Sequence, residues 1–476
     1  MSAENDALKQ RGQSKTADAA ALTSTSDASG IGDASNVIDT ANAAVKGEKS
    51  AKQTTDYASH WHKQDTIWTF SLFGTAVGAG VLFLPIKAGS AGILSLLFMV
   101  VLAFPLTYFA HRALCRFVLT AKHPGDDITD VVEQQFGFGF GMVFTIIYFV
   151  QIFTIILVYA VSITNTTESF IVNQLHMTAP PRWLLSGLLI GVLVCIVTCG
   201  TDVVTKVTSA MTYPVIAVLV LFALYLIPHW NTSILTSYPK TAGGAFDWGT
   251  LIQDLWLLVP VTIFGFDHSA IISSFCVNLR EGYGLEQSDH KMMSILKRAE
   301  PLMVFVVLFF VLSCDLALTP GDLVKAKAQN VSILSYIANM LNSPVIAWIA
   351  SLTAFVSIFK AFLGHYLGVE EGLGGIIRKI GEKKHRIIER RPLHIFVAIF
   401  MFVTCWLVAW ANLSVINMIE TMVGPIIAFI LLLLPMYAIH KVPSLKKYSG
   451  KISNVFIVVI GVISVSAIFY NIVELF

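Results

Sequence analysis

Long apolar stretches separated by short polar connections extend over most of the chain. Each stretch is about 20 residues long, which is the length that an α-helix needs to cross a hydrocarbon layer about 30 Å thick. We predict eleven such helices, at 66–86, 92–113, 141–165, 183–200, 207–228, 255–277, 301–319, 344–368, 393–411, 414–439 and 453–474. The ninth and tenth are separated only by Ala411-Asn412-Leu413, so a ten-helix interpretation that joins them stays open. The pattern predicts an all-α integral membrane protein built as one bundle.

Residues 1–60 depart from this pattern. They are rich in Ala, Ser, Thr, Asp and Lys and contain no sustained apolar run. Such a segment buries too little surface to offset its ordering entropy, so we predict a disordered cytoplasmic tail. It also lacks the apolar core of a secretory signal. The expected organisation is a tail at 1–60, a ten-helix core at 61–440 and an additional C-terminal helix at 441–476.

Composition supports the membrane assignment and weakens two other classes of protein. The chain is 55% hydrophobic and 13% charged, whereas a soluble domain carries about 25% charged residues. The six cysteines form no CxxC pair, so we expect no metal site, disulfide framework or cofactor. Clustered catalytic groups and a folded soluble output domain are both missing from the pattern, which disfavours a membrane enzyme or a sensor.

The basic residues in the connections predict the orientation. One set of connections holds 19 Lys and Arg residues and the opposite set holds five. Because cytoplasmic loops carry the excess of basic residues, we place the N-terminus in the cytoplasm and the C-terminus on the outside. The basic run 378–391 could contact anionic lipid. Positive-inside retention already accounts for this run, so nucleic-acid binding is not expected.

Glycines interrupt the first predicted helix. Gly74, Gly78 and Gly80 fall within seven residues, and each weakens a helix by about 1 kcal/mol relative to alanine. Freed backbone groups at membrane depth are tolerated only where protein or a cavity satisfies them. The segment is therefore either an unwound site whose N–H groups bind a carboxylate, or a close packing surface of small residues.

The sixth predicted helix is interrupted as well. Gly265, Asp267 and His268 lie near its middle, and Pro260 precedes them by about a turn and a half. Ionisable groups at membrane depth are costly and indicate a functional site. Paired interruptions in corresponding helices of two halves are typical of a transporter site at the membrane midplane. We therefore predict that helices 1–5 and 6–10 form two repeats, with helix 11 as an addition.

Lys360 lies in the eighth predicted helix, roughly 12 Å from its cytoplasmic end. One interpretation is that its side chain reaches back to the membrane surface. The other is that it faces the interior beside His365, where it exchanges a proton or stays charged in the place of a sodium ion. The second interpretation makes Lys360 a candidate coupling residue.

Other polar residues in the predicted helices receive weaker interpretations. Glu420 in the tenth helix is either a gate residue or solvated, and Gly424-Pro425 should bend that helix. Tyr148 and Gln151 in the third helix are candidate polar contacts to a substrate. The remaining groups are expected to have no role in the site: Asp315 and Glu168 as solvated groups near outer helix ends, and His111 as a helix-boundary residue.

Eight motifs, in order along the chain, resemble the hydroxy and aromatic amino-acid permeases of bacteria, most of all their serine and threonine proton symporters. The motifs are GTAVGAGVLFLP (74–85), FPLTYFAHRAL (104–114), ITNTTESF (163–170), HSAIISSF (268–275), QNVSILSYIAN (329–339), KAFLGHYLG (360–368), GPIIA (424–428) and LPMYAIHKVPSLKKYSG (434–450). They extend from about residue 60 to the end of the chain.

The resemblance implies a leucine-transporter-like fold of eleven spans, with five-helix inverted repeats and one extra helix. It also implies that the two broken segments hold the charged ends of an amino acid, the carboxylate at the first and the ammonium at the second. With the polar candidates above, the expected binding residues are Thr75, Gly78, Ala79, Gly80, Tyr148, Gln151, Phe264, Gly265, Phe266 and Asp267.

The resemblance also bears on the coupling ion. In sodium-coupled relatives of this fold a cation site lies between the first and eighth helices, and Lys360 falls on the eighth-helix part of it. A fixed positive charge there disfavours sodium, which by analogy favours a proton. The chain departs from the family at Asp267, where those permeases carry asparagine. This carboxylate could bind the substrate ammonium, take up the coupled proton or pair with Lys360.

The expected function is import of a small hydroxylated L-amino acid, first of all serine, by proton symport across a bacterial cytoplasmic membrane. The alternatives are a threonine, cysteine or aromatic amino-acid carrier, or a sodium-coupled symporter. The expected partners are the amino acid, the proton and the lipid bilayer. The pattern does not indicate an oligomeric state.

Overall fold

The computed structural model describes residues 60–341, 343–383 and 389–470, and this part of the chain is built from helices and connecting loops. The predicted tail falls outside it, apart from residue 60. The α-helices are α3 (Lys63–Ala76), α4 (Ala79–Ser90), α5 (Ile93–Val118), α6 (Ile128–Phe136), α7 (Phe138–Asn173), α8 (Arg182–Thr198), α9 (Thr201–Leu226), α10 (Trp248–Gly265), α11 (Ile272–Ala317), α12 (Pro320–Ala328), α13 (Ile333–Met340), α14 (Pro344–Lys383), α15 (Arg390–Ala411), α16 (Val415–Met418), α17 (Gly424–Ala428), α18 (Leu434–Lys441) and α19 (Ile452–Ser466).

Short 3-10 and π-helical turns connect or interrupt these helices. They are η1 (Ile227–His229), η2 (Ile234–Thr236), η3 (Ser269–Ile271), η4 (Ile419–Val423), η5 (Phe429–Leu433) and η6 (Pro443–Tyr448). The π-helical turns η4 and η5 flank Gly424-Pro425 in the tenth predicted helix. The irregularity predicted at this dipeptide therefore takes the form of two widened turns, one on each side.

Eight helical segments of the described residues are long and apolar enough to cross a membrane, and the bent pair α3 and α4 makes a ninth. One of them, Trp248–Ala317, contains both the sixth and the seventh predicted helix, and α8 is a shorter apolar helix of 17 residues. With these two included, the eleven predicted helices all have counterparts. We number them as spans 1 to 11 in chain order.

Two span boundaries differ from the simplest pattern. Spans 9 and 10 are separate helices because Asn412 adopts a left-handed conformation, with φ 52°. The second half of span 6 and the whole of span 7, by contrast, both lie in α11, whose two helical parts meet at a kink at Gly284, with φ 70°. The helices α6, α12 and α13 lie in connections and were not predicted.

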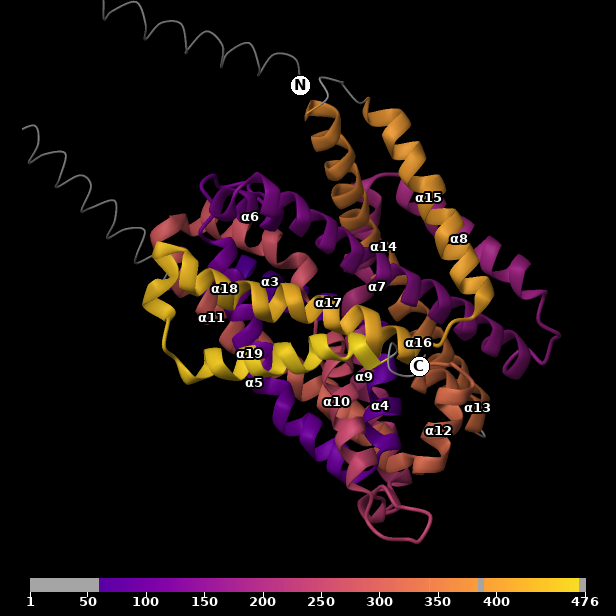
Figure 1. Ribbon diagram of the computed structural model, residues 1–476. Coiled ribbons are helices and arrows are strands. Elements are labelled where there is room, and N and C mark those ends of the chain that lie inside the picture. Colours follow the sequence, from indigo (N-terminus) through magenta and orange to yellow (C-terminus); the bar gives the residue numbers. More distant parts are fainter. Residues whose placement is uncertain (1–59, 342, 384–388, 471–476) are drawn as a thin grey trace, which may run out of the picture. The chain divides into compact units, whose positions relative to one another are not determined.

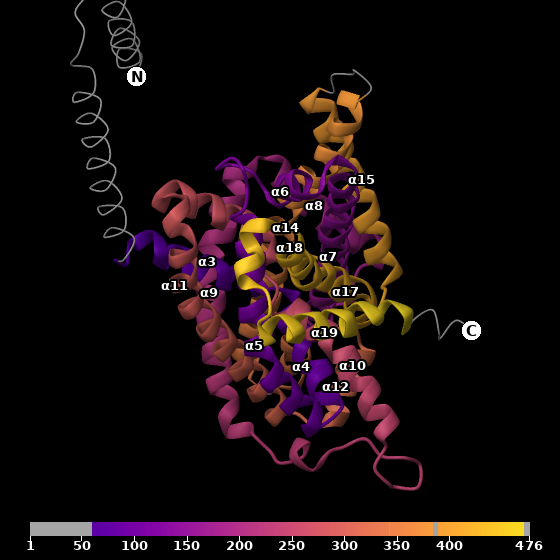
Figure 2. The same ribbon diagram turned by 60° about the vertical axis from the view of Figure 1, so that its left-hand side comes forward.

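The spans pack in two groups (Figures 1 and 2). Spans 1, 2, 6 and 7 contact one another through α3, α4, α5, α10 and α11, while spans 3, 4, 8 and 9 contact one another through α7, α8, α14 and α15. Spans 5 and 10 touch both groups, and α19 packs against span 10 and α10. The breaks in spans 1 and 6 both lie in the first group.

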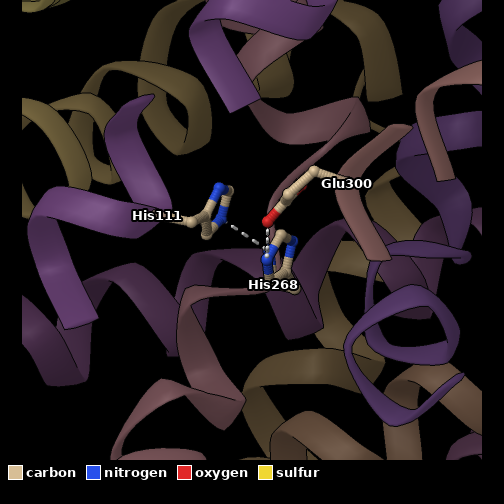
Figure 3. A group of neighbouring side chains, drawn as sticks. All are labelled: His111, His268 and Glu300. Atoms are coloured by element: carbon tan, nitrogen blue, oxygen red, sulfur yellow. Dashed lines mark hydrogen bonds and ion pairs between the residues drawn. The ribbon is translucent and has the colours of Figure 1, made fainter. Parts of the chain in front are cut away.

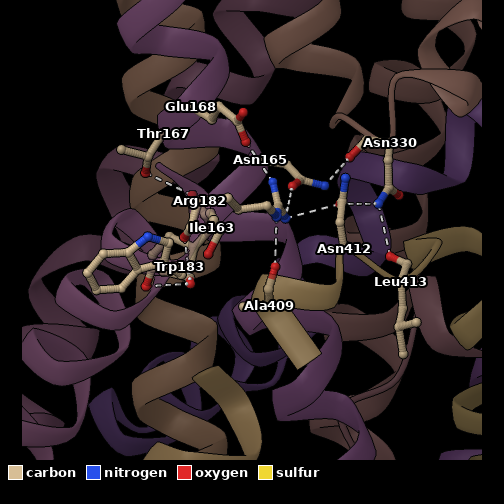
Figure 4. A network of polar contacts seen from close by, with 12 residues as sticks. Ile163, Asn165, Thr167, Glu168, Arg182, Trp183, Asn330, Ala409, Asn412 and Leu413 are labelled. Carbon is tan, nitrogen blue, oxygen red and sulfur yellow. Dashed lines mark hydrogen bonds and ion pairs between the residues drawn. The ribbon is translucent and has the colours of Figure 1, made fainter. Parts of the chain in front are cut away.

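A polar network joins the ends of spans 3, 4 and 9 (Figure 4). The Arg182 guanidinium donates to Glu168 at 2.6 Å, to Asn165 at 2.5 Å and to Asn412 at 3.0 Å. Asn330, in the connection between α12 and α13, donates to Asn412 at 3.0 Å. Glu168, predicted to be solvated, has a side chain that is 38% exposed and also forms an ion pair with Arg182. The network fixes the second group of helices at this end.

Candidate functional site

The break in span 1 consists of Val77 and Gly78. The axes of α3 and α4 differ by 56°, and both residues have extended backbone geometry. A Cβ placed on Gly78 would lie 2.9 Å from Ala361 Cβ and 3.2 Å from the Tyr159 hydroxyl. Since real Cβ atoms are not found this close to a backbone-anchored methyl, only glycine fits where span 1 passes spans 3 and 8.

Lys360 contacts the end of α3 from span 8. Its Nζ donates to the carbonyl oxygen of Gly74 at 2.6 Å, and the residue is 4% exposed. The side chain therefore faces the interior, so the interpretation that it reaches the membrane surface is wrong. Within the described residues no carboxylate lies within 4.0 Å of Nζ, which rules out the suggested ion pair with Asp267 in this structure.

The break in span 6 lies between the end of α10 at Gly265 and the turn η3. Here the side chain of Asp267 accepts a hydrogen bond from the backbone N–H of Ser269 at 2.9 Å, so it caps that turn. Gln151 of α7 donates through Nε2 to the Ser269 hydroxyl at 3.2 Å. Its Oε1 is buried without a hydrogen bond to any described residue. The structure thus brings Gln151 to the span 6 break, while its contact with a substrate stays a prediction.

The two breaks touch through their backbones. A Cβ on Gly80 would lie 2.7 Å from the carbonyl oxygen of Phe264 and 3.0 Å from Gly265 Cα. The N-terminal end of α4 and the C-terminal end of α10 therefore meet at this point. A helix N-terminus offers free N–H groups and partial positive charge, and a C-terminus offers free carbonyls and partial negative charge. This pairing of ends is complementary to a zwitterion.

The other predicted residues lie at different distances from this junction. The Thr75 hydroxyl donates to Ser71 O, within its own helix, at 2.9 Å. Tyr148 is half-buried and stacks against Phe144 on α7. Tyr159, on the same helix as Tyr148, is buried with its ring centre 6.4 Å from that of Phe264. Tyr159 therefore lies beside the junction, whereas the ring contact of Tyr148 is with another residue of α7.

An ionic cluster connects spans 1, 6 and 10 on the side of α12. Lys87 at the end of α4 pairs with Glu420 at 2.9 Å and with Asp254 of α10 at 3.4 Å. Lys87 and Glu420 are each only 4% exposed as side chains, so the solvated interpretation of Glu420 is wrong. All three residues line a cavity of about 660 Å³. We call Lys87, Asp254 and Glu420 the α4-end cluster.

A second ionic cluster connects spans 1 and 7 at the opposite end of span 1. Asp65 in the first turn of α3 pairs with Lys291 of α11 at 2.6 Å and accepts from the Tyr283 hydroxyl at 2.7 Å. Asp65 and Lys291 are each 1% exposed. Sequence patterns missed this pair because both residues lie outside apolar runs. We call these three residues the α3-start cluster.

A third buried cluster lies where spans 2, 6 and 7 meet (Figure 3). The rings of His111 and His268 stack with centres 3.5 Å apart and an interplanar angle of 8°. His268 Nε2 is 3.0 Å from Glu300 Oε1, and His111 Nε2 is 3.8 Å from Asp267 Oδ1. The prediction that His111 marks a helix boundary is wrong, because it is 1% exposed inside α5. Glu300 was not predicted, since it directly precedes the apolar run of span 7.

The ligand atoms of His111, His268 and Glu300 lie within 4.8 Å of one another, so a metal ion has to be considered. A histidine coordinates through a lone pair in the plane of its ring, at about 2.0–2.1 Å for zinc. Two parallel rings 3.5 Å apart cannot both direct that lone pair at one ion. The observed stacking therefore does not form a metal site, and no other such group is found among the described residues.

Asp315 also differs from its prediction. It was expected to be solvated near the outer end of span 7, but it is fully buried. Neither of its carboxylate oxygens has a hydrogen bond to any described residue. A Cβ on Gly89 would lie 2.7 Å from Asp315 Oδ1, so this carboxyl packs directly against α4. The burial arises from this packing against α4, which the apolar pattern of a single helix cannot show.

Comparison with known protein families and sequences gives consistent matches. Residues 64–468 match the model of the tryptophan/tyrosine permease family. The serine transporter SdaC of Escherichia coli is 53% identical over 87% of this chain and 96% of its own length. The threonine/serine transporter TdcC of Escherichia fergusonii is 42% identical over 87% of this chain and 97% of its own length.

A solved structure supports the fold. MhsT in complex with L-phenylalanine superposes with a TM-score of 0.53 and 13% identity, covering 87% of this chain and 99% of that protein. The likeness confirms the predicted leucine-transporter-like, all-helical architecture.

Proposed function

Because the chain belongs to the tryptophan/tyrosine permease family, we propose that it imports a small hydroxylated L-amino acid, first of all serine, by proton symport. Its high identity to a protein named a serine transporter, over nearly the full length of both, supports serine as the substrate. The multiple apolar spans make it a multi-pass protein of the inner membrane.

The junction of the two breaks is the observation that carries this proposal. The substrate carboxylate accepts from the backbone N–H groups of Gly78, Ala79 and Gly80 at the start of α4, and its ammonium donates to the carbonyls of 264–266 at the end of α10. The two ends approach to within van der Waals contact at Gly80 and Phe264, so a short zwitterion can bridge them. The partial positive charge at the start of α4 favours the substrate carboxylate, and the partial negative charge at the end of α10 favours its ammonium.

Gln151 supplies a recognition group for the side-chain hydroxyl. Its Oε1 is a buried acceptor without a partner among the described residues, which costs about 1–3 kcal/mol until a donor arrives. A serine hydroxyl is such a donor, whereas alanine offers none. Sites that hydrogen-bond a substrate hydroxyl reject analogues lacking it more strongly than apolar pockets do.

Lys360 favours the proton over sodium as the coupling ion. Its ammonium donates to the Gly74 carbonyl, one of the backbone groups that the broken span 1 presents to span 8. A cation already fixed at this position repels a sodium ion by Coulomb interaction in a site of low dielectric. Together with Asp267 at the span 6 break, it gives the interior a set of ionisable groups that respond to protonation.

The two ionic clusters act as gates on either side of the junction. Lys87 and Glu420 link span 1 to span 10 and close the side next to the cavity, which we assign to the outside. Asp65 and Lys291 close the opposite side, which we assign to the cytoplasm. Transport requires that these pairs open alternately. This assignment agrees with the basic-residue count, which puts the N-terminus in the cytoplasm and the C-terminus in the periplasm.

The regions flanking the spans have subordinate roles in the proposal. The transport core at 61–440 and the additional helix at 441–476 stay predictions, and the predicted tail at 1–60 lies outside the described residues apart from residue 60. The predicted contact of the basic run 378–391 with anionic lipid falls partly on residues outside the described part of the chain.

Threonine is the second candidate substrate, because a relative named a threonine/serine transporter also matches over most of both chains. Counterflow of labelled L-serine in proteoliposomes, competed with unlabelled threonine, cysteine, alanine and tryptophan, tests the substrate. Serine should compete best and threonine next, with alanine at least about tenfold weaker if Gln151 binds the hydroxyl. Equal competition by alanine would contradict the role of Gln151, and absence of serine counterflow would contradict the substrate.

A further inference from the structure

The cluster of His111, His268 and Glu300 lies outside the substrate junction and the two gates. His111 comes from α5, His268 from the break in span 6, and Glu300 from α11 (Figure 3). Each is at most 1% exposed. Three buried ionisable groups from three spans need a reason to be there, because each costs solvation free energy.

The hydrogen bonds of the two rings locate a proton in this cluster. His111 Nδ1 lies 2.9 Å from Thr107 O and so donates to it, which leaves Nε2 to accept from the backbone N–H of His268 at 3.3 Å. His268 Nδ1 lies 3.2 Å from Phe266 O and donates to that carbonyl. The remaining His268 Nε2 is then a lone pair 3.0 Å from Glu300 Oε1. Two acceptors approach this closely only with a proton between them.

Glu300 depends on that proton. Apart from His268, no described residue donates a hydrogen bond to either of its oxygens, and no Lys or Arg lies within 4.0 Å of it in the described part of the chain. An ionised Glu300 beside a neutral ring would therefore be a buried, unpaired charge, which proteins avoid. The packed arrangement is stable only in the protonated state, whether the proton resides on the ring or on the carboxyl.

We infer that the His268–Glu300 pair binds the proton that crosses the membrane with the amino acid. This inference rests on the proposed proton symport and specifies its proton site. One proton enters from the outside, is held between Nε2 and Oε1, and leaves to the cytoplasm, so that the pair returns to its starting state. Neither partner changes covalently in the cycle.

The pair is linked to the substrate junction through one carbonyl. Phe266 O accepts from His268 Nδ1 and also belongs to the set of carbonyls assigned to the substrate ammonium. An ammonium bound at this oxygen competes with the ring for it, so substrate binding alters the hydrogen bonding of the same imidazole that holds the proton. Because both use Phe266 O, binding of the substrate ammonium and binding of the proton are coupled through the side chain of His268.

Loss of the proton drives the conformational change. The deprotonated pair carries a negative charge that only water can solvate at this position, because no described residue other than His268 lies near enough to donate to Glu300. Hydration requires the span 6 break and α11 to separate. Protonation outside therefore favours the closed arrangement, and release to the cytoplasm favours an open one.

Other titratable groups surround the pair. From α5 come His111 and the Cys115 thiol, from α11 the Cys276 thiol, and from the span 6 break Asp267. Asp267 is the most exposed member of this set, at 7%, and it is also within electrostatic range of Tyr159 and His365.

Serine-driven proton entry tests the inference. The purified full chain is reconstituted in proteoliposomes that contain the pH dye pyranine, and an inward serine gradient is applied. Serine exchange is measured in parallel, because exchange requires the substrate site but no net proton movement. In Glu300→Gln, proton entry should fall at least tenfold while exchange stays within about threefold of the unmodified protein. Glu300→Asp should restore part of the proton entry.

Asp315→Asn is the matched control, since Asp315 is an equally buried carboxyl on α11 with no imidazole within 4.0 Å in the described structure. It should leave proton entry unchanged. If Glu300→Gln does not yield a monodisperse protein, His268→Gln removes the other half of the pair and carries the same expectation.

The outcomes separate this inference from the proposed function. Undiminished serine-driven proton entry in Glu300→Gln would overturn the site assignment and leave proton symport intact. Serine exchange without any proton entry in the unmodified protein would overturn proton symport itself. Loss of exchange on addition of EDTA would show that the cluster binds a metal ion, and would also overturn the inference.

Discussion

The breaks in span 1 and span 6 differ in the groups that replace the lost helical hydrogen bonds. The span 1 break is built from small residues, and the ammonium of Lys360 satisfies a carbonyl of its first half. The span 6 break is built from Phe266, Asp267 and His268, and its own carboxylate and imidazole satisfy it. One break is thus held by a positive charge supplied from another helix, and the other by groups that can exchange a proton.

This difference suggests different roles for the two breaks. Small residues let the first break approach the second to within backbone contact, which suits binding of a short substrate. Ionisable residues at the second break connect that substrate to spans 2 and 7 through His111 and Glu300. We therefore propose that both breaks recognise the substrate and that the second break responds to protons.

Removing the cation from the span 1 break should have the largest effect. Lys360→Met keeps the length of the side chain but leaves the Gly74 carbonyl without its charged donor, at a cost of about 3 kcal/mol. We expect proton-driven serine uptake to fall about 100-fold. Lys379→Met is the control, because Lys379 lies on the same helix and pairs with Glu133 near the surface. Uptake by Lys360→Met at the rate of this control would show that the cation is dispensable.

Separating the two breaks should have the next largest effect. In Gly80→Ala the new Cβ would lie 2.7 Å from the backbone oxygen of Phe264, which cannot rotate away. Overpacking of this kind costs about 1–3 kcal/mol, so serine affinity should fall about tenfold or more. Gly364→Ala, where a Cβ meets nothing within 4 Å, should bind serine normally. Binding is measured with the purified protein, and equal affinity in the two variants would contradict the backbone junction.

Disrupting the α4-end cluster should have a smaller effect. Glu420→Gln removes the carboxylate that pairs with Lys87 at 2.9 Å and leaves Lys87 only Asp254, at 3.4 Å. Serine should dissociate about five- to tenfold faster from the purified protein, because a gate of about 1 kcal/mol or more is lost. The exposed Lys325 pairs with Asp322 at 3.5 Å, and Lys325→Met should change dissociation less than twofold. Unchanged dissociation in Glu420→Gln would show that the α4-end cluster is no gate.

Asp267→Asn should have the smallest effect on the amount of serine transported. The asparagine side-chain oxygen can still accept from the Ser269 N–H, so the turn after the break keeps its cap. We expect steady-state uptake within about threefold of the unmodified protein, since a cap is worth about 1 kcal/mol when it is lost entirely. Complete loss of uptake in a well-folded variant would instead give Asp267 a direct part in binding the substrate ammonium.

The sequence was sufficient to predict the features that depend on local patterns. Apolar runs predicted all eleven spans, and the glycines at 74, 78 and 80 predicted where span 1 breaks. The sequence left two interpretations of Lys360, and the structure agrees with the one that places its side chain in the interior. These predictions succeed because membrane depth forces each span to satisfy its backbone internally, so that an interruption shows in the sequence.

The features that failed depend on contacts between distant segments. His111 and His268 are 157 residues apart, and nothing near His111 in the sequence indicates that another ring stacks on it. Glu300 was not predicted, because it directly precedes the apolar run of span 7. Asp315 was expected to be solvated because its packing against α4 does not show in the pattern of its own helix. A single helix pattern contains no information on which neighbour covers each face.

Uptake of labelled serine under separately imposed ion gradients tests the central claim most directly. Proteoliposomes containing the full chain receive either an inward proton gradient without sodium or an inward sodium gradient at equal pH. The account predicts that serine accumulates above its external concentration with the proton gradient, and only equilibrates with the sodium gradient. Accumulation driven by sodium alone would contradict it.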